Sequence, residues 1–295
     1  MIRTVFRITV AGFAALSLGS GLAAAQTPKR GGMLNFGVVA EPPNYDCHGS
    51  TTFALIHPVA PHYSLLVRFD GKDYPKVIPD LAESWTVAPN GMTYTFKIRS
   101  GVKFHDGSPL TSADIKASYD RIISPPEGVV SIRKAYYADL VVETPDPTTV
   151  VFKLKNPMAG VLEALASPFN CIYSAAKLKE NPRYPETQIM GSGPFTFVEH
   201  VKGSSWEGKR FDGYFIPGKP HLDGFKIYFV KSGGVVPGIL GGQFDAEFRG
   251  RNPSEKAQLL DKAKDNLTVH EGTWVNNLML VFNTTRKPFD DRINW

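Results

Sequence analysis

The sequence lacks any concentration of positive charge. Its 33 Lys and Arg residues are scattered, no run of them is longer than two, and the formal net charge is +5. Proteins that bind nucleic acid normally gather basic residues into a patch or a stripe. The charge pattern therefore argues against a nucleic-acid-binding protein.

A hydrophobic run long enough to span a membrane is missing from the N-terminal region. The apolar stretch Ile8–Leu18 falls short of the roughly 20 residues that a spanning helix needs. It follows two arginines and precedes Ala23–Ala25, which supply the small residues of a cleavage site. The pattern predicts a cleavable signal peptide over residues 1–25 and an exported mature chain that begins at Gln26 and has no membrane span.

Cysteine is nearly absent, with only Cys47 and Cys171 in the whole chain. An exported protein can form a disulfide bond, and this one would close a long loop and contribute about 4–5 kcal/mol in the chain-entropy model. Sequence separation does not show whether the two Cα atoms approach each other. A disulfide and two isolated buried thiols therefore both stay open.

Motifs for nucleophilic and phosphate chemistry are incomplete. The sequence has no G-x-S-x-G, and Gly191-Ser192-Gly193 is too short to supply it. The segment Gly203–Arg210 nearly matches the phosphate-binding pattern G-x-x-x-x-G-K-[ST], but Arg210 stands where a magnesium-binding hydroxyl is required. We interpret this segment as a turn-rich surface loop, and neither pattern supports an enzyme.

The histidines do not form a regular metal-binding pattern either. His105 and Asp106 stand side by side, as in one class of metal-dependent phosphohydrolases, but they follow a predicted strand and lack a second histidine on a helix. His48, His57 and His62 lack regular ligand spacing and are interpreted as loop or core histidines. No metal site and no catalytic site is predicted from these residues.

The segment after His105 and Asp106 has the signals of a turn followed by a capped helix. Asp106-Gly107 is typical of a turn, and Thr111 or Ser112 with Asp114 is typical of a helix N-cap. A helix is predicted over 113–123. Its buried side should carry the apolar residues at helical spacing, Ile115, Tyr119 and Ile122.

Strands are predicted where apolar and polar residues alternate between turn signals. The 50 Pro and Gly residues suit a mixed fold with many turns, and the length suits about two domains. The predicted strands are Met33–Val39, a hairpin of Ser84–Ala88 and Thr93–Ile98 around Pro89–Gly91, and a strand containing Val150, Phe152 and Leu154 after a hairpin turn at Pro145–Pro147.

Several segments, in this order, resemble the extracytoplasmic solute-binding proteins of the peptide/nickel class (solute-binding protein family 5), which feed ABC importers. They include RGGMLNFGVVAEPPNYD, PDLAESWTVAPNGMTYTFKIRSGVKFHDGSPLTSADIKASYDRI, VETPDPTTVVFKLKNP, MGSGPFTFVEH, GKPHLDGFKIYFV and FNTTRKPFDD. In this family the KFHDGSPLT segment belongs to the scaffold, which implies a structural role for His105 and Asp106. The stretch KRFDGYF, Lys209–Phe215, departs from the pattern usual there.

The resemblance implies an α/β, periplasmic-binding-protein-like fold (type II, cluster C), with a mixed-sheet lobe and an inserted α+β lobe. Lobe I would comprise residues 26–62 and 186–272, and lobe II residues 63–185. Residues 273–295 would form a crossing strand and the start of a third lobe that is otherwise missing. Because family members continue well beyond this point, the chain is expected to be a truncated first half.

The resemblance also implies where a ligand binds. The segment HGSTTF resembles the strand that pairs with the ligand backbone, an arginine after FDAEF would meet a carboxylate, and a tryptophan lies on the crossing strand. The expected ligand-binding residues are Thr51, Thr52, Phe53, Tyr136, Arg249 and Trp274.

The expected function is binding and delivery rather than catalysis. The protein would capture a short peptide or a similar small polar solute in a cleft between lobes, in the periplasm, and deliver it to the permease subunits of an ABC importer. It would act as a monomer without a cofactor. The alternatives are a carrier of nickel, another metal chelate or haem within the same family, and an exported hydrolase.

Overall fold

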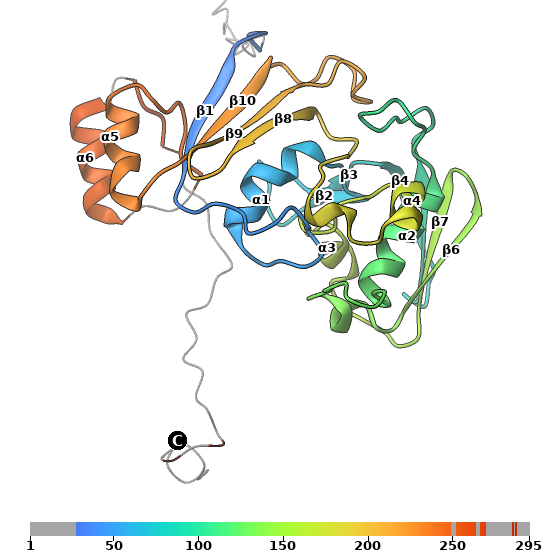
Figure 1. The fold of residues 1–295 in the computed structure, drawn as a ribbon. Helices are drawn as coiled ribbons and strands as arrows, with labels where there is room; N and C mark the ends of the chain where they lie inside the picture. The colour runs from blue at the N-terminus through green and yellow to red at the C-terminus, as the bar shows by residue number, and fades with distance from the viewer. Residues whose placement is uncertain (1–27, 249–251, 264–265, 270–284, 286, 288–295) are drawn as a thin grey trace, which may run out of the picture.

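A computed structural model describes residues 28–248, 252–263, 266–269, 285 and 287 (Figure 1). The described chain forms two four-stranded sheets and one two-stranded sheet, with helices packed around them. The predicted signal peptide lies outside the described residues. Within the described ranges, no helix is long and apolar enough to cross a membrane.

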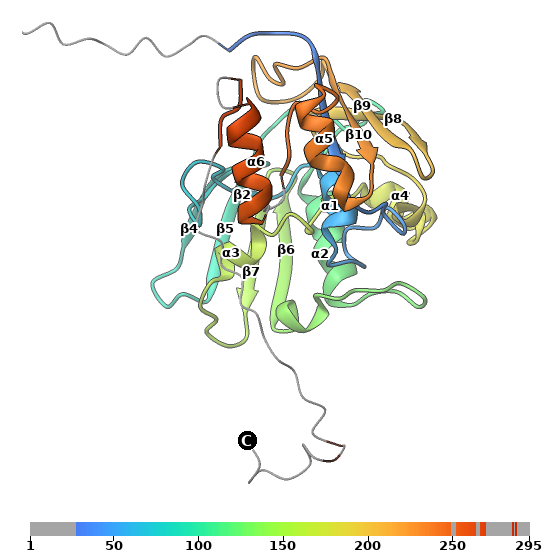
Figure 2. The same ribbon diagram turned by 90° about the vertical axis from the view of Figure 1, so that its left-hand side faces the viewer.

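The first four-stranded sheet brings together strands from distant parts of the chain. Its order is β1-β10-β9-β8, in which β1 pairs parallel with β10 and the other neighbours pair antiparallel. The short helices α5 and α6 lie beside β1, on the side away from the second sheet (Figures 1 and 2). These elements are β1 (Met33–Val38), β8 (Phe195–Val201), β9 (Ser205–Arg210), β10 (Gly224–Phe229), α5 (Val235–Leu240) and α6 (Pro253–Ala263).

The second four-stranded sheet is antiparallel throughout, in the order β4-β5-β7-β6. Its strands are β4 (Ala82–Val87), β5 (Thr93–Ile98), β6 (Leu140–Asp146) and β7 (Thr149–Leu154). The remaining elements are α1 (Phe53–Val59), β2 (Val67–Phe69), β3 (Val77–Pro79), α2 (Ser112–Ile123), α3 (Val161–Leu165), α4 (Ala175–Glu180) and the 3₁₀ helices η1 (Ala60–His62), η2 (Lys134–Tyr137), η3 (Tyr184–Glu186) and η4 (Ser232–Gly234). The predicted first strand and both predicted hairpins are confirmed.

Helix α2 begins where the sequence predicts it. Thr111 is the N-cap, its hydroxyl accepts a hydrogen bond from Ala113 N, and the Asp114 carboxylate accepts one from Thr111 N at 2.8 Å, which completes a capping box. Ile115, Tyr119 and Ile122 are buried against the second sheet, as expected. Local capping and a single apolar face therefore suffice to define this helix.

Two hydrophobic cores follow the two large sheets. One lies between the second sheet and α2, around Phe96, Tyr119 and Phe152. The other lies under the first sheet, around Trp206 and Ile227, together with side chains of α1. The second core also contains Phe169, Cys171, Tyr173 and Tyr184, which come from the chain between β7 and β8. The return segment from the second sheet is thereby packed against the first.

The interpretation of Gly203–Arg210 as a surface loop is wrong for most of its length. Gly203 and Ser204 form a turn, but the following residues form β9, which lies between β8 and β10 inside the first sheet. Trp206 on this strand is fully buried. The glycines and charges of the segment concealed a strand that has one large apolar side chain on its core side.

His62 is a core histidine, as interpreted from the sequence. Its Nδ1 donates to the carbonyl of Phe195 at 2.8 Å, and its Nε2 accepts from the indole nitrogen of Trp206 at 2.9 Å. Burial lowers the pKa of His62 to about 3. The ring is therefore neutral and serves to join η1 to the first sheet.

The glycines of the segment Gly191-Ser192-Gly193 allow two backbones to touch. A Cβ on Gly193 would lie 2.5 Å from both His62 C and Tyr63 N, so there is no flexible side chain that could move aside. Gly193→Ala is therefore expected to lower the free energy of unfolding by about 3 kcal/mol, the upper end of the usual overpacking cost. Urea denaturation measures this loss.

The matched control for this prediction is Gly233→Ala. Gly233 has no atom within 4 Å of the position of an added Cβ and no positive φ, so the change should be nearly neutral. If both variants have the same urea midpoint as the wild type, the close packing at Gly193 makes no contribution to the free energy of unfolding.

Candidate functional site

A small pocket lies where β1 ends and α1 begins. Its volume is about 160 Å³, and its lining residues are Val38, Val39, Ala40, Thr51, Thr52, Phe53, Ala54 and His57. Three of the six residues predicted to contact a ligand, Thr51, Thr52 and Phe53, thus form one wall. The other wall is the end of β1 and the chain that leaves it, Val38–Ala40.

The expectation that HGSTTF forms a strand is wrong. Thr52 is the N-cap of α1: its backbone is extended, and its Oγ1 accepts a hydrogen bond from Ala54 N at 3.2 Å. Phe53 is the first residue of the helix. A threonine before the apolar run of a helix is itself an N-cap signal, and this local signal outweighs the resemblance to a strand.

His57 lines the candidate site, and the sequence interpretation did not place it there. It lies four residues after Phe53 on α1, and their ring centroids are 5.4 Å apart. Residues at this spacing share a helix face. Recognition of Thr52 as an N-cap would therefore have predicted that Phe53 and His57 lie on the same side of α1. His57 supplies an imidazole at the site, where the sequence suggested only a loop or core residue.

A second, apolar pocket adjoins the first through His57. Its volume is about 170 Å³. Half of its lining residues, Leu34, Phe36, Phe195 and Phe225, lie on strands of the first sheet, and the others are His57, Pro61, Leu222 and Phe248. The candidate site therefore has a compartment with two threonine hydroxyls and a compartment with aromatic and aliphatic walls, and His57 borders both.

The other predicted ligand contacts are not brought into this site by the described structure. Tyr136 lies on η2, is 68% exposed, and does not line either pocket. Arg249 and Trp274 lie outside the described residues. Of these three, only Tyr136 can be placed, on the segment that packs against the chain leading to Thr51.

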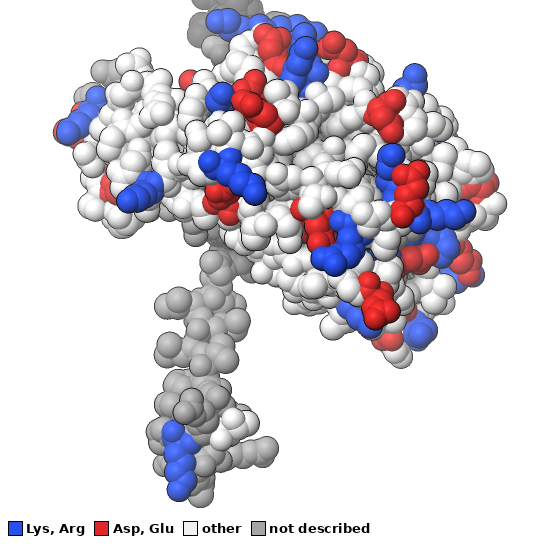
Figure 3. Space-filling view, viewed as in Figure 1, with Lys and Arg blue, Asp and Glu red and all other residues white. Residues whose placement is uncertain are grey.

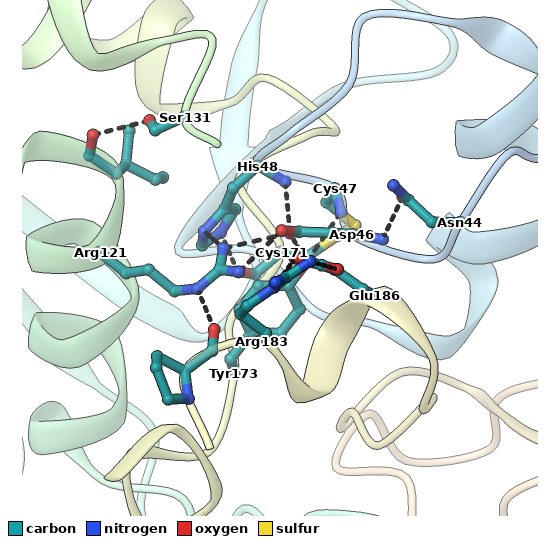
Figure 4. Close-up of polar contacts among 12 residues, drawn as sticks. Asn44, Asp46, Cys47, His48, Arg121, Ser131, Cys171, Tyr173, Arg183 and Glu186 are labelled. Atoms are coloured by element: carbon teal, nitrogen blue, oxygen red, sulfur yellow. Dashed lines mark hydrogen bonds and ion pairs between the residues drawn. A yellow bond between two sulfur atoms is a disulfide. The ribbon is translucent and has the colours of Figure 1, made fainter. Parts of the chain in front are cut away.

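A buried polar network holds the chain segment that leads to the wall Thr51–Phe53 (Figure 4). Arg121 of α2 donates to both carboxylate oxygens of Asp46, at 2.7 and 3.1 Å, and each side chain is 3% exposed. The hydroxyl of Tyr173 donates to the same carboxylate at 3.0 Å. His48 accepts from Arg121 through Nδ1 and donates through Nε2 to the carbonyl of Cys171. Every charge in this network has a partner.

The protonation states in the network follow from burial and from these partners. Burial raises the pKa of Asp46, but His48 and Arg121 outweigh this effect, and the pKa lies below its usual value. Burial lowers the pKa of His48 to about 4. Since His48 is thus neutral at pH 7, the positive charge that compensates Asp46 at that pH is Arg121.

Cys47 and Cys171 form a disulfide, which decides the alternative that the sequence left open. Both cysteines are fully buried. The bond connects the chain between β1 and α1 to the segment that follows α3 (Figure 4). It therefore lies beside the Asp46–Arg121 ion pair and holds the same stretch of chain.

His105 has a structural role in the described chain. Its backbone N donates to Gly191 O at 2.8 Å, its Nε2 donates to Gly193 O at 3.0 Å, and its ring packs edge-on against Phe211. Asp106 accepts from Ser108 within the predicted turn. Within the described residues, no group of three His, Cys, Asp or Glu side chains is placed to hold a metal ion.

Replacement of His105 by alanine is expected to lower stability without changing ligand affinity. The variant leaves the buried carbonyl of Gly193 without this donor, which costs about 1–3 kcal/mol of the free energy of unfolding. Ligand affinity should stay within about threefold of wild type, because His105 does not line either pocket. Urea denaturation and calorimetric titration measure the two quantities, and a hundredfold loss of affinity in a folded variant would place His105 in a binding site.

The visible surface carries mixed charges. On the face shown in Figure 3, Lys and Arg side chains lie among Asp and Glu. Ion pairs between such side chains occur in the described chain, for example Lys153 with Glu143 at 2.7 Å and Lys116 with Asp120 at 2.8 Å. Neither sign of charge forms a large patch on the face that Figure 3 shows.

Comparison with known proteins identifies the family. Residues 76–293 match the bacterial extracellular solute-binding proteins, family 5. The match extends over most of the chain, and the chain belongs to this family. Its α/β architecture is the periplasmic-binding-protein-like fold of the solved relatives, and the family and these relatives are binding proteins rather than enzymes.

Three relatives show the range of ligands. The glutathione-binding protein GsiB of Escherichia coli K12 is 33% identical over 211 residues, which are 72% of this chain and 41% of GsiB. The structure of AgaA from A. tumefaciens R10, in complex with agropinic acid, is 33% identical with a TM-score of 0.67, over 72% of this chain and 43% of AgaA. AppA of Bacillus subtilis, in complex with a nonapeptide, is 29% identical with a TM-score of 0.67, over 74% of this chain and 44% of AppA. The chain thus spans less than half the length of these relatives.

Proposed function

We propose that the chain is part of the extracytoplasmic receptor of an ABC importer, which captures a short peptide or a similar small polar solute and delivers it to the permease subunits. The observation that carries this proposal is the pocket between β1 and α1 in a chain of the solute-binding family. The signal peptide over residues 1–25, the periplasmic location and the monomeric state are parts of the same proposal.

We further propose that the two large sheets belong to different lobes. Lobe I comprises residues 26–62 and 186–272, lobe II comprises 63–185, and residues 273–295 begin the crossing to a third lobe. Each large sheet has its own hydrophobic core, which supports assigning the sheets to different lobes, and the end of lobe II, from Phe169 to Tyr184, packs into the core of lobe I. In such a receptor, closure of the lobes around the solute is the signal that the permease recognises.

The lining of the pockets indicates which part of a ligand is held there. No Lys, Arg, Asp or Glu is among the residues that line either pocket in the described chain, and His57 is the titratable one. Hydroxyl groups, an imidazole and aromatic rings suit uncharged parts of a ligand, such as peptide groups and apolar side chains. This favours peptide-like solutes over metal chelates, for which no cluster of ligands is present among the described residues.

The proposal is tested by titration calorimetry of the purified chain with a panel of probes. The panel contains S-methylglutathione, a dialanine peptide, a nonapeptide, agropinic acid, nickel with histidine, and haem. A peptide-like member should give saturable binding, and Thr51→Val and Phe53→Ala should each weaken it by about tenfold or less, the range of one lost hydrogen bond or contact. The control is Thr86→Val, an exposed threonine on β4.

Three results would contradict the proposal. One is saturation by nickel or haem alone, which would assign the chain to the metal or haem carriers. Another is steady turnover of a peptide, which would show an enzyme. The third is equal binding by wild type, Thr51→Val and Phe53→Ala, which would place the binding site elsewhere.

A further inference from the structure

The wall of the pocket is continuous with a short segment that has no regular secondary structure. We call residues 46–50 the strap. They leave the loop after β1 and lead directly to Thr51, Thr52 and Phe53. Since the strap has neither a ladder nor helical hydrogen bonds of its own, its position depends on the side chains and backbone groups that it contacts.

Those contacts come from residues between 121 and 173. Cys47 is bonded covalently to Cys171, and Asp46 is paired with Arg121. The backbone N of Ile132 donates to His48 O at 3.2 Å. A disulfide and an ion pair thus attach the start of the strap, several residues before the wall of the pocket begins.

Arg133 provides the attachment nearest the pocket. Its guanidinium donates to Ser50 O at 2.9 Å and reaches Cys47 O at 3.5 Å. The same guanidinium lies over the ring of Phe169, 4.2 Å from the ring centroid. A planar guanidinium can stack on an aromatic ring and still donate several hydrogen bonds in its plane, whereas an ammonium group cannot do both in the same way.

We propose that Arg133 is a positioning residue for the candidate site. It holds the backbone at Ser50, and through it the wall Thr51–Phe53, at a fixed distance from the opposite wall Val38–Ala40. The disulfide limits how far the strap can move, and Arg133 fixes the position of its last residue, Ser50. Arg133 does not touch the ligand. The inference rests on the proposed function for its effect on affinity, but its effect on the wall can be measured without a ligand.

The first measurement is hydrogen exchange on the wild-type chain and on Arg133→Gln. The amides of Ala54, Leu55 and Ile56 bond to Thr52 at the start of α1 and report on the wall. In Arg133→Gln, exchange in a peptide covering residues 51–56 should be about tenfold faster. The reason is that opening of the wall no longer has to break the hydrogen bond from a charged donor to Ser50 O. Exchange in a peptide covering β7 should not change.

Two further variants separate the roles of charge and geometry. Arg133→Lys retains the charge and should recover only part of the protection, because Lys cannot both stack on Phe169 and donate in the plane of the ring. Lys134→Gln removes an exposed neighbouring charge and should exchange as wild type does. The double variant Cys47→Ser/Cys171→Ser, which retains Arg133, should also show faster exchange in the 51–56 peptide.

The second measurement is calorimetric affinity for S-methylglutathione and the nonapeptide, which bring no free thiol to the disulfide. Arg133→Gln should raise Kd by about tenfold, and Lys134→Gln should leave it unchanged. Unchanged exchange in the 51–56 peptide, or faster exchange in β7 to the same degree, would overturn the inference. Faster exchange with unchanged Kd would overturn its link to binding. If the wild type binds no probe, the proposed function fails, and the exchange data alone decide whether Arg133 holds the wall.

Discussion

Removal of the Cys47–Cys171 disulfide is expected to lower the free energy of unfolding by about 5 kcal/mol in the chain-entropy model. The two cysteines are 124 residues apart, and a cross-link over so long a loop removes much of the conformational freedom of the unfolded chain. Both cysteines are fully buried, so the double variant Cys47→Ser/Cys171→Ser also places two hydroxyls in the core. The measurement is urea denaturation of this variant and of the wild type under non-reducing conditions.

Two controls separate the cross-link from the side chains. Cys47→Ala/Cys171→Ala removes the same bond without adding hydroxyls, and its loss should be similar if the cross-link dominates. A reductant in the denaturation buffer should destabilise the wild type and leave both double variants unchanged. A loss of less than about 1 kcal/mol in the alanine variant would mean that the unfolded chain gains little freedom when the bond is absent.

Asp46→Ala is expected to lower the free energy of unfolding by about 3–5 kcal/mol, because it leaves Arg121 charged and buried without its partner. Arg121 is 3% exposed and would retain hydrogen bonds to Pro182 O and His48. Neither of these groups carries a negative charge. The loss should therefore exceed the usual cost of one hydrogen bond, and thermal or urea denaturation at pH 7 measures it.

The matched control is the double variant Asp46→Ala/Arg121→Met, in which both charges are gone. It should recover a large part of the stability lost in the single variant, because no uncompensated charge remains in the core. A double variant that is as unstable as Asp46→Ala would show that the loss comes from packing and from Tyr173 rather than from an unpaired charge.

The pH dependence of this effect has a definite sign. The folded-state pKa of Asp46 lies below the value in the unfolded chain. The contribution of its carboxylate is therefore fully present above the unfolded pKa and is lost as the pH falls through the folded pKa. The difference between wild type and Asp46→Ala should thus be constant from pH 7 to pH 5 and shrink only in more acidic buffer.

Elements that depend on neighbouring residues could be predicted from the sequence. The capping box of Thr111 and Asp114 and the turn of the hairpin around Pro89–Gly91 each need only a few adjacent positions. The site was predicted less well, because it depends on chain segments that meet only in the fold. The resemblance predicts Thr51–Phe53 as ligand contacts but in a strand rather than at the start of a helix, and the sequence gives no signal that His57 lines a pocket.

The errors also have local causes. Ser205–Arg210 contains a glycine and three charged residues, which favour a surface loop, and only pairing with β8 and β10 makes it an interior strand. The disulfide could not be decided, because the approach of Cys47 and Cys171 requires the whole second sheet to form and return. Both the strand β9 and the disulfide depend on tertiary contacts. The residue pattern within a short stretch of sequence does not reveal such contacts.

The bond between Cys47 and Cys171 makes a covalent ring of the chain that lies between them, and this ring includes every strand of the second sheet. A protease that cuts once inside the ring, for example at the exposed turn between β4 and β5, opens the ring but releases no fragment. The nicked chain should keep the mobility of a single species on a non-reducing gel and separate into two pieces only after reduction. Two cuts are needed before any part of the second sheet can leave the molecule.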